Sequence, residues 1–296
     1  MSIPGLGRLA PEPTAASAKR TVVLAPFSEW RFQVPRATSS VTVRLIQGTA
    51  DRDGTELARN RPYTFTRTKS RIFTLQGCTL EVTGDCESSV AQYDPEGDSP
   101  LSRTLELHSR LHYLRKRALI AVAGISGPRV LVCGSRYSGK TTLVRTLTAW
   151  GTKLGMQPLV VNLDPNEGML SLPGTVSSAV FGTIMDLEEP AGGFGIRSTP
   201  SSGPSHVPVK LPIAYHYGRE KVADDPQHWK DVTSKLASSV RAKLKDDLRV
   251  RASGILVDMP AVDASNDRDG LILHVVKEFN SGFFCRGRFL SLGLIA

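Results

Sequence analysis

Hydrophobic and polar residues alternate with a period of two between Arg20 and Tyr93. The alternating segments read TVVLAPF, WRFQV, SVTVRLIQG, YTFTRT and SRIFTLQGCTLEVTG, and glycine, aspartate and proline separate them. Alternation in segments rich in valine, threonine, phenylalanine and isoleucine predicts strands with one buried face and one solvated face. We therefore expect a small antiparallel β domain over residues 20–98, after a flexible N-terminal segment of residues 1–19.

The pattern changes in YDPEGDSP (residues 93–100), which predicts a linker because proline, glycine and aspartate cluster where the periodicity stops. Apolar residues then recur at helical spacing and predict a helix in a connecting segment of residues 99–124. The expected apolar stripe of this helix is Leu105, Leu107, Leu111, Leu114, Ala118 and Leu119. On its other faces we expect Arg110, Arg115, Lys116 and Arg117. His108 and His112 are four apart, and we interpret them as solvated rather than as half of a metal site.

From Pro128 onward, apolar runs alternate with helical patterns. RVLVCG, PLVVNLD and SGILVDMP are apolar throughout, and KTTLVRTLTAWGTKLG reads as a helix that ends in glycine. Strands without alternation are typical of parallel sheets that are covered on both faces. We expect an α/β domain over residues 125–296, interrupted by a surface insertion in STPSSGPSHVP (residues 198–208).

A further helix is predicted in KLASSVRAKLKDDLRVRAS, which carries both an apolar stripe and many cations. The stripe consists of Leu236, Val240, Leu244 and Leu248. The cations around it are Lys235, Arg241, Lys243, Lys245, Arg249 and Arg251. Two interpretations stay open: a core-facing helix with a solvated basic face, or a surface that binds RNA directly.

Composition adds a possible partner to this picture. The chain has 296 residues, with 37 Lys and Arg against 28 Asp and Glu, and its net charge of +9 suits RNA or an acidic protein. The four cysteines form no C-x-x-C pair, so we expect reduced thiols in an intracellular protein. No signal-peptide core and no run of about 18 apolar residues is present, so we expect no membrane partner.

The loop between the first apolar strand and its helix matches G-x-x-x-x-G-K-[ST] at Gly134, Gly139, Lys140 and Thr141. Glycines let backbone N–H groups converge on an anion, and the helix N-terminus adds partial positive charge. Lys140 is expected at the β- and γ-phosphates of a nucleotide, and Thr141 at Mg²⁺. The alternative is a glycine-rich turn without a ligand. The nucleotide-binding residues expected in this segment are Gly134, Tyr137, Ser138, Gly139, Lys140, Thr141 and Thr142.

An aspartate at a neighbouring strand end usually supports the Mg²⁺ of such a loop. Asp258 ends the apolar run GILVD, and Asp164 ends LVVNLD directly after the loop's helix. The pattern alone does not choose between the two aspartates. For each of them, an ordinary role in capping a turn is as good an interpretation as a role at Mg²⁺.

Several longer segments, in order from about Ser28 to Phe279, carry a family resemblance. GTELARNRPYTFT, FTLQGC, GPRVLVCGSRYSGKTTL, VVNLDPNEGMLSLPG and LPIAYHYG resemble the polynucleotide 5′-hydroxyl kinases and pre-mRNA cleavage-factor subunits, most of all the fungal ATP-binding subunits of cleavage factor IA. The resemblance implies a β-rich N-terminal domain, a P-loop domain and a C-terminal β domain. It implies a nuclear protein of pre-mRNA 3′-end cleavage and polyadenylation that uses ATP for assembly. The implied partners are the polymerase-associated subunit of cleavage factor IA and other 3′-end processing proteins.

The resemblance also assigns residues. Glu29, in SEWRF, and Lys69, in TKSRIFTL, match the family positions that read adenine. Asp164 matches the second aspartate of the family's D-x-D-x-G-Q box, so the expected Mg²⁺ residues are Thr141 and Asp164, with Asp258 as the alternative.

Departures from the family pattern bear on catalysis. Where active members have D-x-D-x-G-Q, this chain has NLDPNE, with Asn162, Asp164, Asn166 and Glu167 at the four fixed positions. A T-x-G-W-like clasp is expected after Asp258, but VDMPAVD contains no tryptophan. Loss of a carboxylate and of an amide donor predicts nucleotide binding without phosphoryl transfer. The alternative function is an ATP-dependent RNA 5′-hydroxyl kinase.

The last segment departs as well. After GLILHVVKEFN the family pattern continues with a strand, an arginine-bearing lid and a β domain, whereas this sequence reads SGFFCRGRFLSLGLIA. The difference predicts an altered or truncated reading frame in which the family's C-terminal β domain is missing. Absent lid arginines would further weaken phosphoryl transfer.

Overall fold

The computed structural model describes residues 19–35, 39–94, 100–121, 125–188, 194, 212–262, 267, 269–286 and 291–294. Contacts divide the chain into two compact units. The first contains Met1–Ala50 and Leu57–Gln92, and the second contains Asp51–Glu56 and Tyr93–Ala296. Most of the predicted N-terminal segment, linker residues 95–99 and the predicted insertion at residues 198–208 lie outside the described residues.

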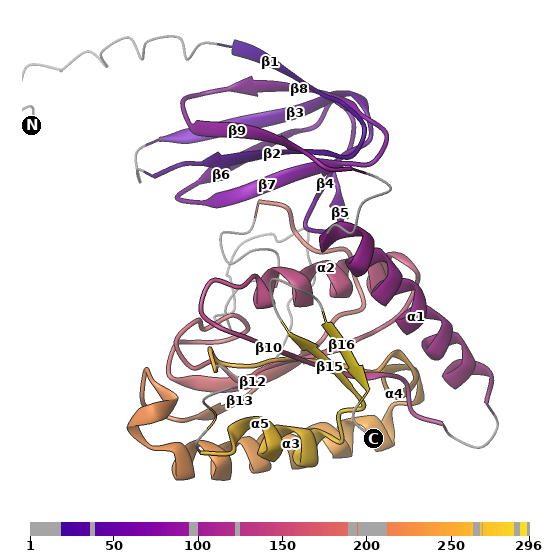
Figure 1. The fold of residues 1–296 in the computed structure, drawn as a ribbon, viewed down its shortest axis with the longest axis vertical. Helices are drawn as coiled ribbons and strands as arrows, with labels where there is room; N and C mark the ends of the chain where they lie inside the picture. The colour runs from indigo at the N-terminus through magenta and orange to yellow at the C-terminus, as the bar shows by residue number, and fades with distance from the viewer. Residues whose placement is uncertain are drawn as a thin grey trace, which may run out of the picture. The chain divides into compact units, whose positions relative to one another are not determined.

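Antiparallel strands form the first unit, as the alternating sequence predicts (Figure 1). One sheet has the order β1 (Lys19–Leu24), β8 (Cys78–Thr83), β3 (Ser40–Gly48) and β6 (Pro62–Thr66). In the other, β2 (Ser28–Gln33) pairs with β7 (Lys69–Thr74) and β9 (Glu87–Gln92). Alternate side chains of β3 and β8 are buried, including Val41, Val43, Leu80 and Val82. This burial confirms the expected antiparallel β domain.

A seven-stranded sheet forms the centre of the second unit. Its order is β13 (Ile213–His216), β12 (Thr175–Val180), β11 (Leu159–Asn162), β14 (Ile255–Asp258), β10 (Arg129–Cys133), β15 (Phe283–Arg286) and β16 (Ser291–Leu294). The four strands β11, β14, β10 and β15 are parallel. The apolar runs predicted β10, β11 and β14, whereas β15 was not predicted. The outer strands β12, β13 and β16 run antiparallel, so the sheet is mixed rather than purely parallel.

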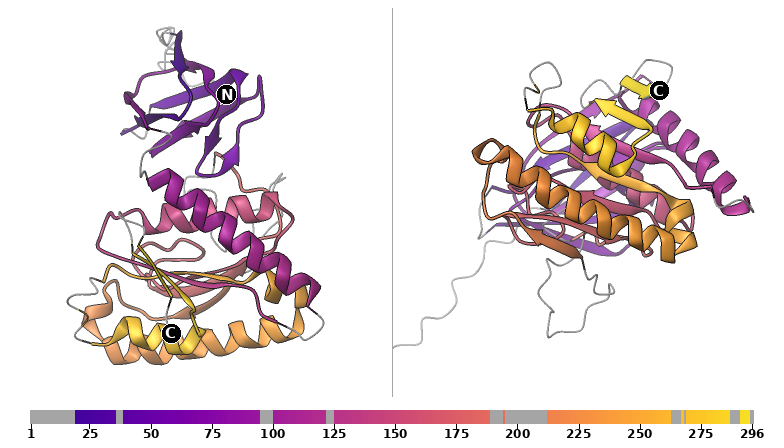
Figure 2. Two further views of the ribbon diagram at one scale, coloured as in Figure 1. Left: turned by 45° about the vertical axis from the view of Figure 1, so that its right-hand side comes forward. Right: turned by 90° about the horizontal axis from the view of Figure 1, so that it is seen from below.

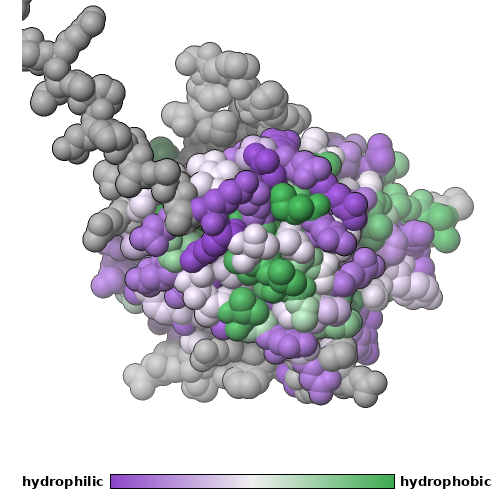
Figure 3. All heavy atoms as spheres, turned by 90° about the horizontal axis from the view of Figure 1, so that it is seen from above, coloured by the Kyte–Doolittle hydropathy of each residue, from purple (hydrophilic) through white to green (hydrophobic). Residues whose placement is uncertain are grey.

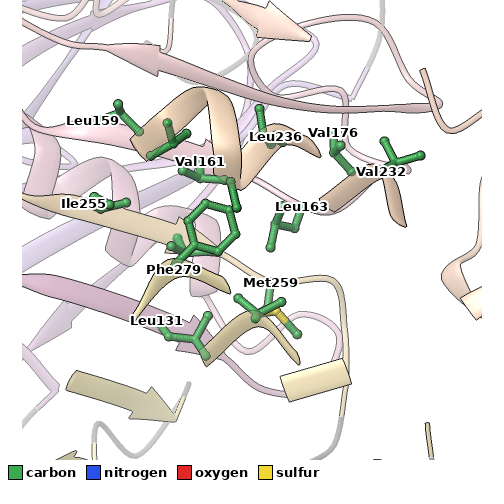
Figure 4. Close-up of a cluster of buried hydrophobic side chains, with 14 of the residues drawn as sticks. Leu131, Leu159, Val161, Leu163, Val176, Val232, Leu236, Ile255, Met259 and Phe279 are labelled. Carbon is green, nitrogen blue, oxygen red and sulfur yellow. The ribbon is translucent and has the colours of Figure 1, made fainter. Parts of the chain in front are cut away.

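Helices cover both faces of this sheet (Figures 1 and 2). One face packs against α1 (Pro100–Ile120) and α2 (Lys140–Lys153), and the other against α3 (Pro226–Asp246) and α5 (Leu271–Phe279). Neighbouring strand residues point to opposite cores: Val130 packs with the α1–α2 side, whereas Leu131 packs with the α3–α5 side. Figure 4 shows Leu131 near Phe279 in the second of these cores. A one-turn helix η1 (Val222–Asp224) precedes α3.

Arg115 does not lie on a solvated face of α1, as the sequence predicted. It is 1% exposed and shares the buried stripe of Leu107, Leu111 and Ala118. Its Nε donates a 2.8 Å hydrogen bond to the carbonyl of Ser253, the last residue of α4 (Leu248–Ser253). A cation at a helix C-terminus compensates the partial negative charge of the last carbonyls, which explains why an arginine occupies an apolar stripe.

Leu248 does not continue the apolar stripe of α3, because it is 62% exposed. The carboxylate of Asp247 accepts the backbone N–H of Val250 and starts the new helix α4, which changes the direction of the stripe. Leu236, Val240 and Leu244 are buried in the core as expected. On the basic face, two cations form ion pairs within the chain, Arg241 with Glu278 and Lys243 with Asp247. Direct RNA binding by this helix stays a prediction.

The short hairpin of β4 (Asp51–Arg52) and β5 (Thr55–Glu56) belongs by its contacts to the second unit. The carboxylate of Asp53 forms an ion pair with Arg145 of α2, and Glu56 pairs with Lys153 of the same helix. The φ angle of Gly54 is +90°, and an added Cβ would lie 3.0 Å from the carbonyl oxygen of Thr146. Both facts require glycine at the turn of this hairpin.

On the face that Figure 3 shows, hydrophilic and weakly polar residues surround smaller apolar areas. In the first unit the large apolar side chains with the greatest exposure are Val23 at 72% and Val90 at 56%. Among the described residues, no helix has the length and apolar character needed to span a bilayer.

Candidate nucleotide-binding site

The loop after β10 has the backbone conformation that its glycines allow. The φ angles of Gly134 and Gly139 are +146° and +85°. An added Cβ at Gly139 would meet no atom within 4 Å, so glycine is required there by backbone conformation rather than by space. The next residues form α2, whose first hydrogen bond runs from the N–H of Leu143 to the carbonyl of Gly139. The first N–H groups of α2 have no partner within the helix and are available to an anion.

Lys140 begins α2 and is only 6% exposed. Its ammonium group donates a 3.2 Å hydrogen bond to the backbone carbonyl of Ser135 in the same loop. The hydroxyl of Ser138 is buried and has no hydrogen-bond partner. A mostly buried ammonium with one neutral acceptor and an unsatisfied hydroxyl in the same loop suit a phosphate group, which would supply the missing negative charge and acceptors.

Other predicted residues of the loop differ in exposure. The Tyr137 side chain is 88% exposed and adopts a φ of +61°, and the guanidinium of Arg136 lies 5.1 Å from the centroid of its ring. Thr142 is partly exposed, one position after Thr141 in the first turn of α2. The assignment of these residues to nucleotide binding stays a prediction.

Two carboxylates meet at the hydroxyl of Thr141. Its Oγ1 lies 2.7 Å from Oδ2 of Asp258 and 2.8 Å from Oε2 of Glu167. Asp258 is 1% exposed at the end of β14, whereas Glu167 is exposed in the loop after β11. The other carboxylate oxygen of Asp258, Oδ1, is buried without a hydrogen-bond partner.

Burial is the main influence on both aspartates of the site. It raises the pKa of Asp258 to about 7, and the charges of Glu167 and Asp164 add to the rise. The hydrogen bond from Thr141 and the charge of Lys140 act in the opposite direction. Burial also raises the pKa of Asp164, although less strongly. A nearby cation would lower both pKa values and keep the carboxylates ionised.

Asp164 is held by its own loop. Its backbone N–H donates to Oδ1 of Asn162, its carbonyl accepts from Nδ2 of Asn162, and its Oδ1 accepts from the N–H of Asn166. The carboxylate that bonds the hydroxyl of Thr141 is therefore that of Asp258, the sequence's alternative, together with that of Glu167. The assignment of Asp164 to the Mg²⁺ shell stays a prediction.

The strand order explains the position of Asp258. β14 lies between β10 and β11, and Asp258 is in register with Val132 on one side and Asn162 on the other. β11, the strand that follows α2 in sequence, therefore lies one strand further from the loop after β10 than β14 does. No pattern in the sequence gives this order, and Glu167 was not among the predicted site residues at all.

The side chains present fit Mg²⁺. The ion binds oxygen ligands and commonly takes one or two carboxylates, with the remaining positions left to water and phosphate. Thr141, Asp258 and Glu167 supply a hydroxyl and two carboxylates, and the unpartnered Oδ1 of Asp258 has no other compensation. No group of three or more His, Cys, Asp or Glu side chains that could hold a metal by themselves occurs in the part of the chain that the structure describes. The site therefore depends on other ligands to complete the coordination of the ion.

The two predicted adenine-reading residues lie in the first unit. Glu29 is 1% exposed, and its carboxylate accepts hydrogen bonds from Arg31 and, at 3.2 Å, from Arg71. Lys69 is exposed and pairs across the strands with Gln33 rather than with Glu29, four residues or about 13 Å away. Their roles stay predictions.

Two family models match successive parts of the chain. Residues 23–118 match the N-terminal β-sandwich domain of polyadenylation factor, and residues 134–280 match the P-loop of the mRNA cleavage and polyadenylation factor CLP1. The chain belongs to the CLP1 family.

Fungal relatives are similar to nearly the whole chain. A mRNA cleavage and polyadenylation factor CLP1 from Chaetomium globosum is 49% identical over 97% of this chain, and one from Neurospora crassa is 46% identical over 96%. The chain spans 64% and 65% of the length of these two relatives.

Solved structures of the family have the same fold. A complex of wild-type Clp1p with a segment of Pcf11p matches with a TM-score of 0.78 and 26% identity, over 92% of this chain and 61% of that one. A second structure concerns the extended interface between Pcf11p and Clp1p and ATP loss in a glycine-to-arginine point mutant. It matches with a TM-score of 0.79 and 25% identity, over 91% of this chain and 61% of that one.

Proposed function

We propose that this protein is an ATP-binding subunit of the pre-mRNA 3′-end cleavage and polyadenylation machinery, and that it uses ATP with Mg²⁺ for assembly. The proposal of ATP binding rests mainly on the loop of residues 134–139 and on Lys140, whose mostly buried side chain places an ammonium group at the start of α2. Lys140 would compensate the β- and γ-phosphates. Thr141, Asp258 and Glu167 would hold the cation, which neutralises phosphate charge when it is bound.

An assembly role rather than phosphoryl transfer is supported by Asn162. Its amide is neutral, and both of its polar atoms bond the backbone of Asp164. A side chain engaged in this way neither takes a proton from an attacking hydroxyl nor adds charge to the metal shell. Asp258 would then remain the buried carboxylate of the site, and its Oδ2 already accepts a hydrogen bond from Thr141.

The proposed partner is a protein of the Pcf11p kind, the polymerase-associated subunit of cleavage factor IA. The two solved relatives are complexes or interfaces with Pcf11p, and one of them concerns ATP loss. This role implies that the protein acts in the nucleus, because pre-mRNA 3′ ends are processed in the nucleus. Other 3′-end processing proteins are further proposed partners, and the net charge of +9 allows RNA to be one more.

The test combines nucleotide retention with assembly. Purified protein is analysed for bound ATP, and its binding to a Pcf11p-type partner is measured with wild type and Lys140→Ala. We expect wild type to retain ATP and bind the partner, and the variant to lose both. Equal partner binding by an ATP-free variant would show that ATP does not serve assembly.

The competing function is an ATP-dependent RNA 5′-hydroxyl kinase, for which the same loop provides the phosphate site. ATP labelled at the γ-phosphate is incubated with 5′-hydroxyl RNA, with and without the Pcf11p-type partner. We expect no transfer in either case. Transfer by wild type that Lys140→Ala abolishes would establish the kinase and overturn the assembly-only role.

A further inference from the structure

The hydroxyl of Thr141 has more acceptors than it has hydrogens. Oδ2 of Asp258 and Oε2 of Glu167 lie 2.7 Å and 2.8 Å from the same Oγ1. A hydroxyl carries one hydrogen, so it donates to only one ionised carboxylate at a time. When both carboxylates are ionised, the other contact brings two oxygen lone pairs together. A cation between these oxygens would turn each of these contacts into coordination.

A second observation points to the same missing cation. Oδ1 of Asp258 is buried without a hydrogen-bond partner, on a residue that is 1% exposed. An unpartnered buried carboxylate oxygen costs free energy unless a positive charge compensates it. The nearby ammonium of Lys140 donates instead to the carbonyl of Ser135. Within the described part of the chain, the site thus has carboxylates whose charge is not matched by a bonded cation.

We propose that Glu167 is a direct ligand of the divalent cation of the nucleotide site, and that Thr141, Asp258 and Glu167 bind this cation before nucleotide arrives. This inference rests on the proposed nucleotide site. Two carboxylates and a hydroxyl suit a small hard cation such as Mg²⁺ or Mn²⁺. Asp258 is fixed at the end of β14, while Glu167 is exposed and reaches the site from the solvent side. Glu167 is therefore the residue through which the cation is retained when no phosphate oxygen is present.

The experiment titrates the nucleotide-free chain with Mn²⁺ and measures free Mn²⁺ by electron paramagnetic resonance, with Mg²⁺ as competitor. We expect one Mn²⁺ per chain in wild type. Glu167→Gln keeps the shape of the side chain and removes its charge, and we expect it to weaken Mn²⁺ binding about 10- to 100-fold. Glu220→Gln removes an exposed glutamate elsewhere in the second unit and serves as the matched control, with unchanged binding.

Thermal unfolding in EDTA keeps the test independent of folding. Glu167→Gln removes repulsion between carboxylates, so we expect it to unfold at a temperature no lower than that of wild type. Wild type that binds no Mn²⁺ without nucleotide, or Glu167→Gln that binds Mn²⁺ as wild type does, would overturn the inference. ATP binding in the presence of Mg²⁺ is measured in parallel, because its absence in wild type would refute the proposed nucleotide site while the Mn²⁺ titration still reports on Glu167.

Discussion

The hydroxyl of Thr141 donates a 2.7 Å hydrogen bond to Oδ2 of Asp258, a residue 117 positions further along the chain. The contact exists because β14 lies beside β10 in the sheet, so that the end of one strand meets the loop that follows the other. Parallel strands present their carboxyl ends at one edge, where open α/β sheets bind their ligands. This relationship determines which strand-end carboxylate bonds the hydroxyl of Thr141.

Mg²⁺ is expected to raise the ATP affinity of wild type, and Asp258→Asn is expected to remove most of this increase. ATP affinity measured with magnesium should fall about tenfold or more, because the variant removes the buried charge beside Thr141. ATP affinity in EDTA should change little. The measurement is ATP affinity with magnesium and with EDTA, for Asp258→Asn and Asp164→Asn. A loss of the magnesium increment in Asp164→Asn alone would support the sequence-based assignment of Asp164 and contradict the one from the contacts.

Lys140→Ala is expected to abolish ATP retention, with affinity lowered at least about tenfold, because it removes the mostly buried ammonium that we propose compensates the phosphates. Equilibrium dialysis with ATP measures the effect. Lys153→Ala is the matched control, because Lys153 ends the same helix and forms an exposed ion pair with Glu56. Equal ATP binding by wild type and Lys140→Ala would contradict the assignment.

Glu29→Gln is expected to weaken ATP binding and to spare inorganic triphosphate, if the carboxylate reads the base as the family resemblance implies. Glutamine is preferred to alanine here, because Glu29 is buried and glutamine fills the same space and keeps an acceptor oxygen for Arg31 and Arg71. Competition binding with both ligands makes the comparison. Similar weakening of ATP and triphosphate would mean that Glu29 has no role specific to adenine.

Local patterns predicted the elements of this fold well, since each depends on neighbouring residues. The alternation in SVTVRLIQG became β3, and Leu236, Val240 and Leu244 entered the core as the helical spacing predicted. The stripe prediction was wrong at Leu248, where the cap formed by Asp247 starts a new helix. The prediction that Arg115 lies on a solvated helix face was also wrong. Arg115 is buried, and its side chain donates a hydrogen bond to the last carbonyl of α4.

The candidate site was predictable only in its contiguous part. The loop with Lys140 and Thr141 is one segment, and its motif encodes its conformation. The partners of Thr141 come from two other segments, and their approach depends on strand order, which periodicity does not encode. The sequence therefore offered Asp164 and Asp258 as equals and gave no sign that Glu167 would bond the same hydroxyl.

His108 should make the second unit less stable in acid. Burial, then the positive charges of Arg115 and His112, lowers its pKa from 6.5 to about 4, and its Nδ1 is buried without a partner. Because the folded pKa lies below the unfolded one, the unfolded chain binds more protons between pH 6.5 and pH 4, and stability falls as pH falls through that window. With allowance for partial exposure, we expect a loss of about 1–2 kcal/mol.

Urea unfolding at several pH values between 7 and 4.5 measures this loss. His108→Phe keeps an aromatic ring against Trp150, whose centroid lies 5.1 Å from that of the histidine ring, and it cannot take up a proton. The variant should show a weaker decline of the unfolding free energy with acid than wild type. Tyr113→Phe, at an exposed position of the same helix, serves as the control. Identical pH profiles for wild type and His108→Phe would rule out this source of acid sensitivity.

The ion pair of Asp53 with Arg145 should be worth more than a surface pair, because the two side chains are 2% and 16% exposed. Burial, with the charge of Arg52, lowers the pKa of Arg145 to about 9, so the guanidinium is still charged at neutral pH and needs its carboxylate. Asp53→Asn removes that charge and tolerates the φ of +48° at this turn. We expect it to lower the free energy of unfolding by about 3 kcal/mol.

A double-mutant cycle in urea separates the charge effect from a simple loss of packing. Arg145→Met keeps a long apolar side chain in α2 and removes the buried cation that Asp53→Asn leaves less compensated. The double variant should therefore be more stable than Asp53→Asn alone, because no buried charge of this pair remains. If the two substitutions simply add, then Asp53 and Arg145 are not coupled, and the hairpin of β4 and β5 is held to α2 by packing around Gly54 instead.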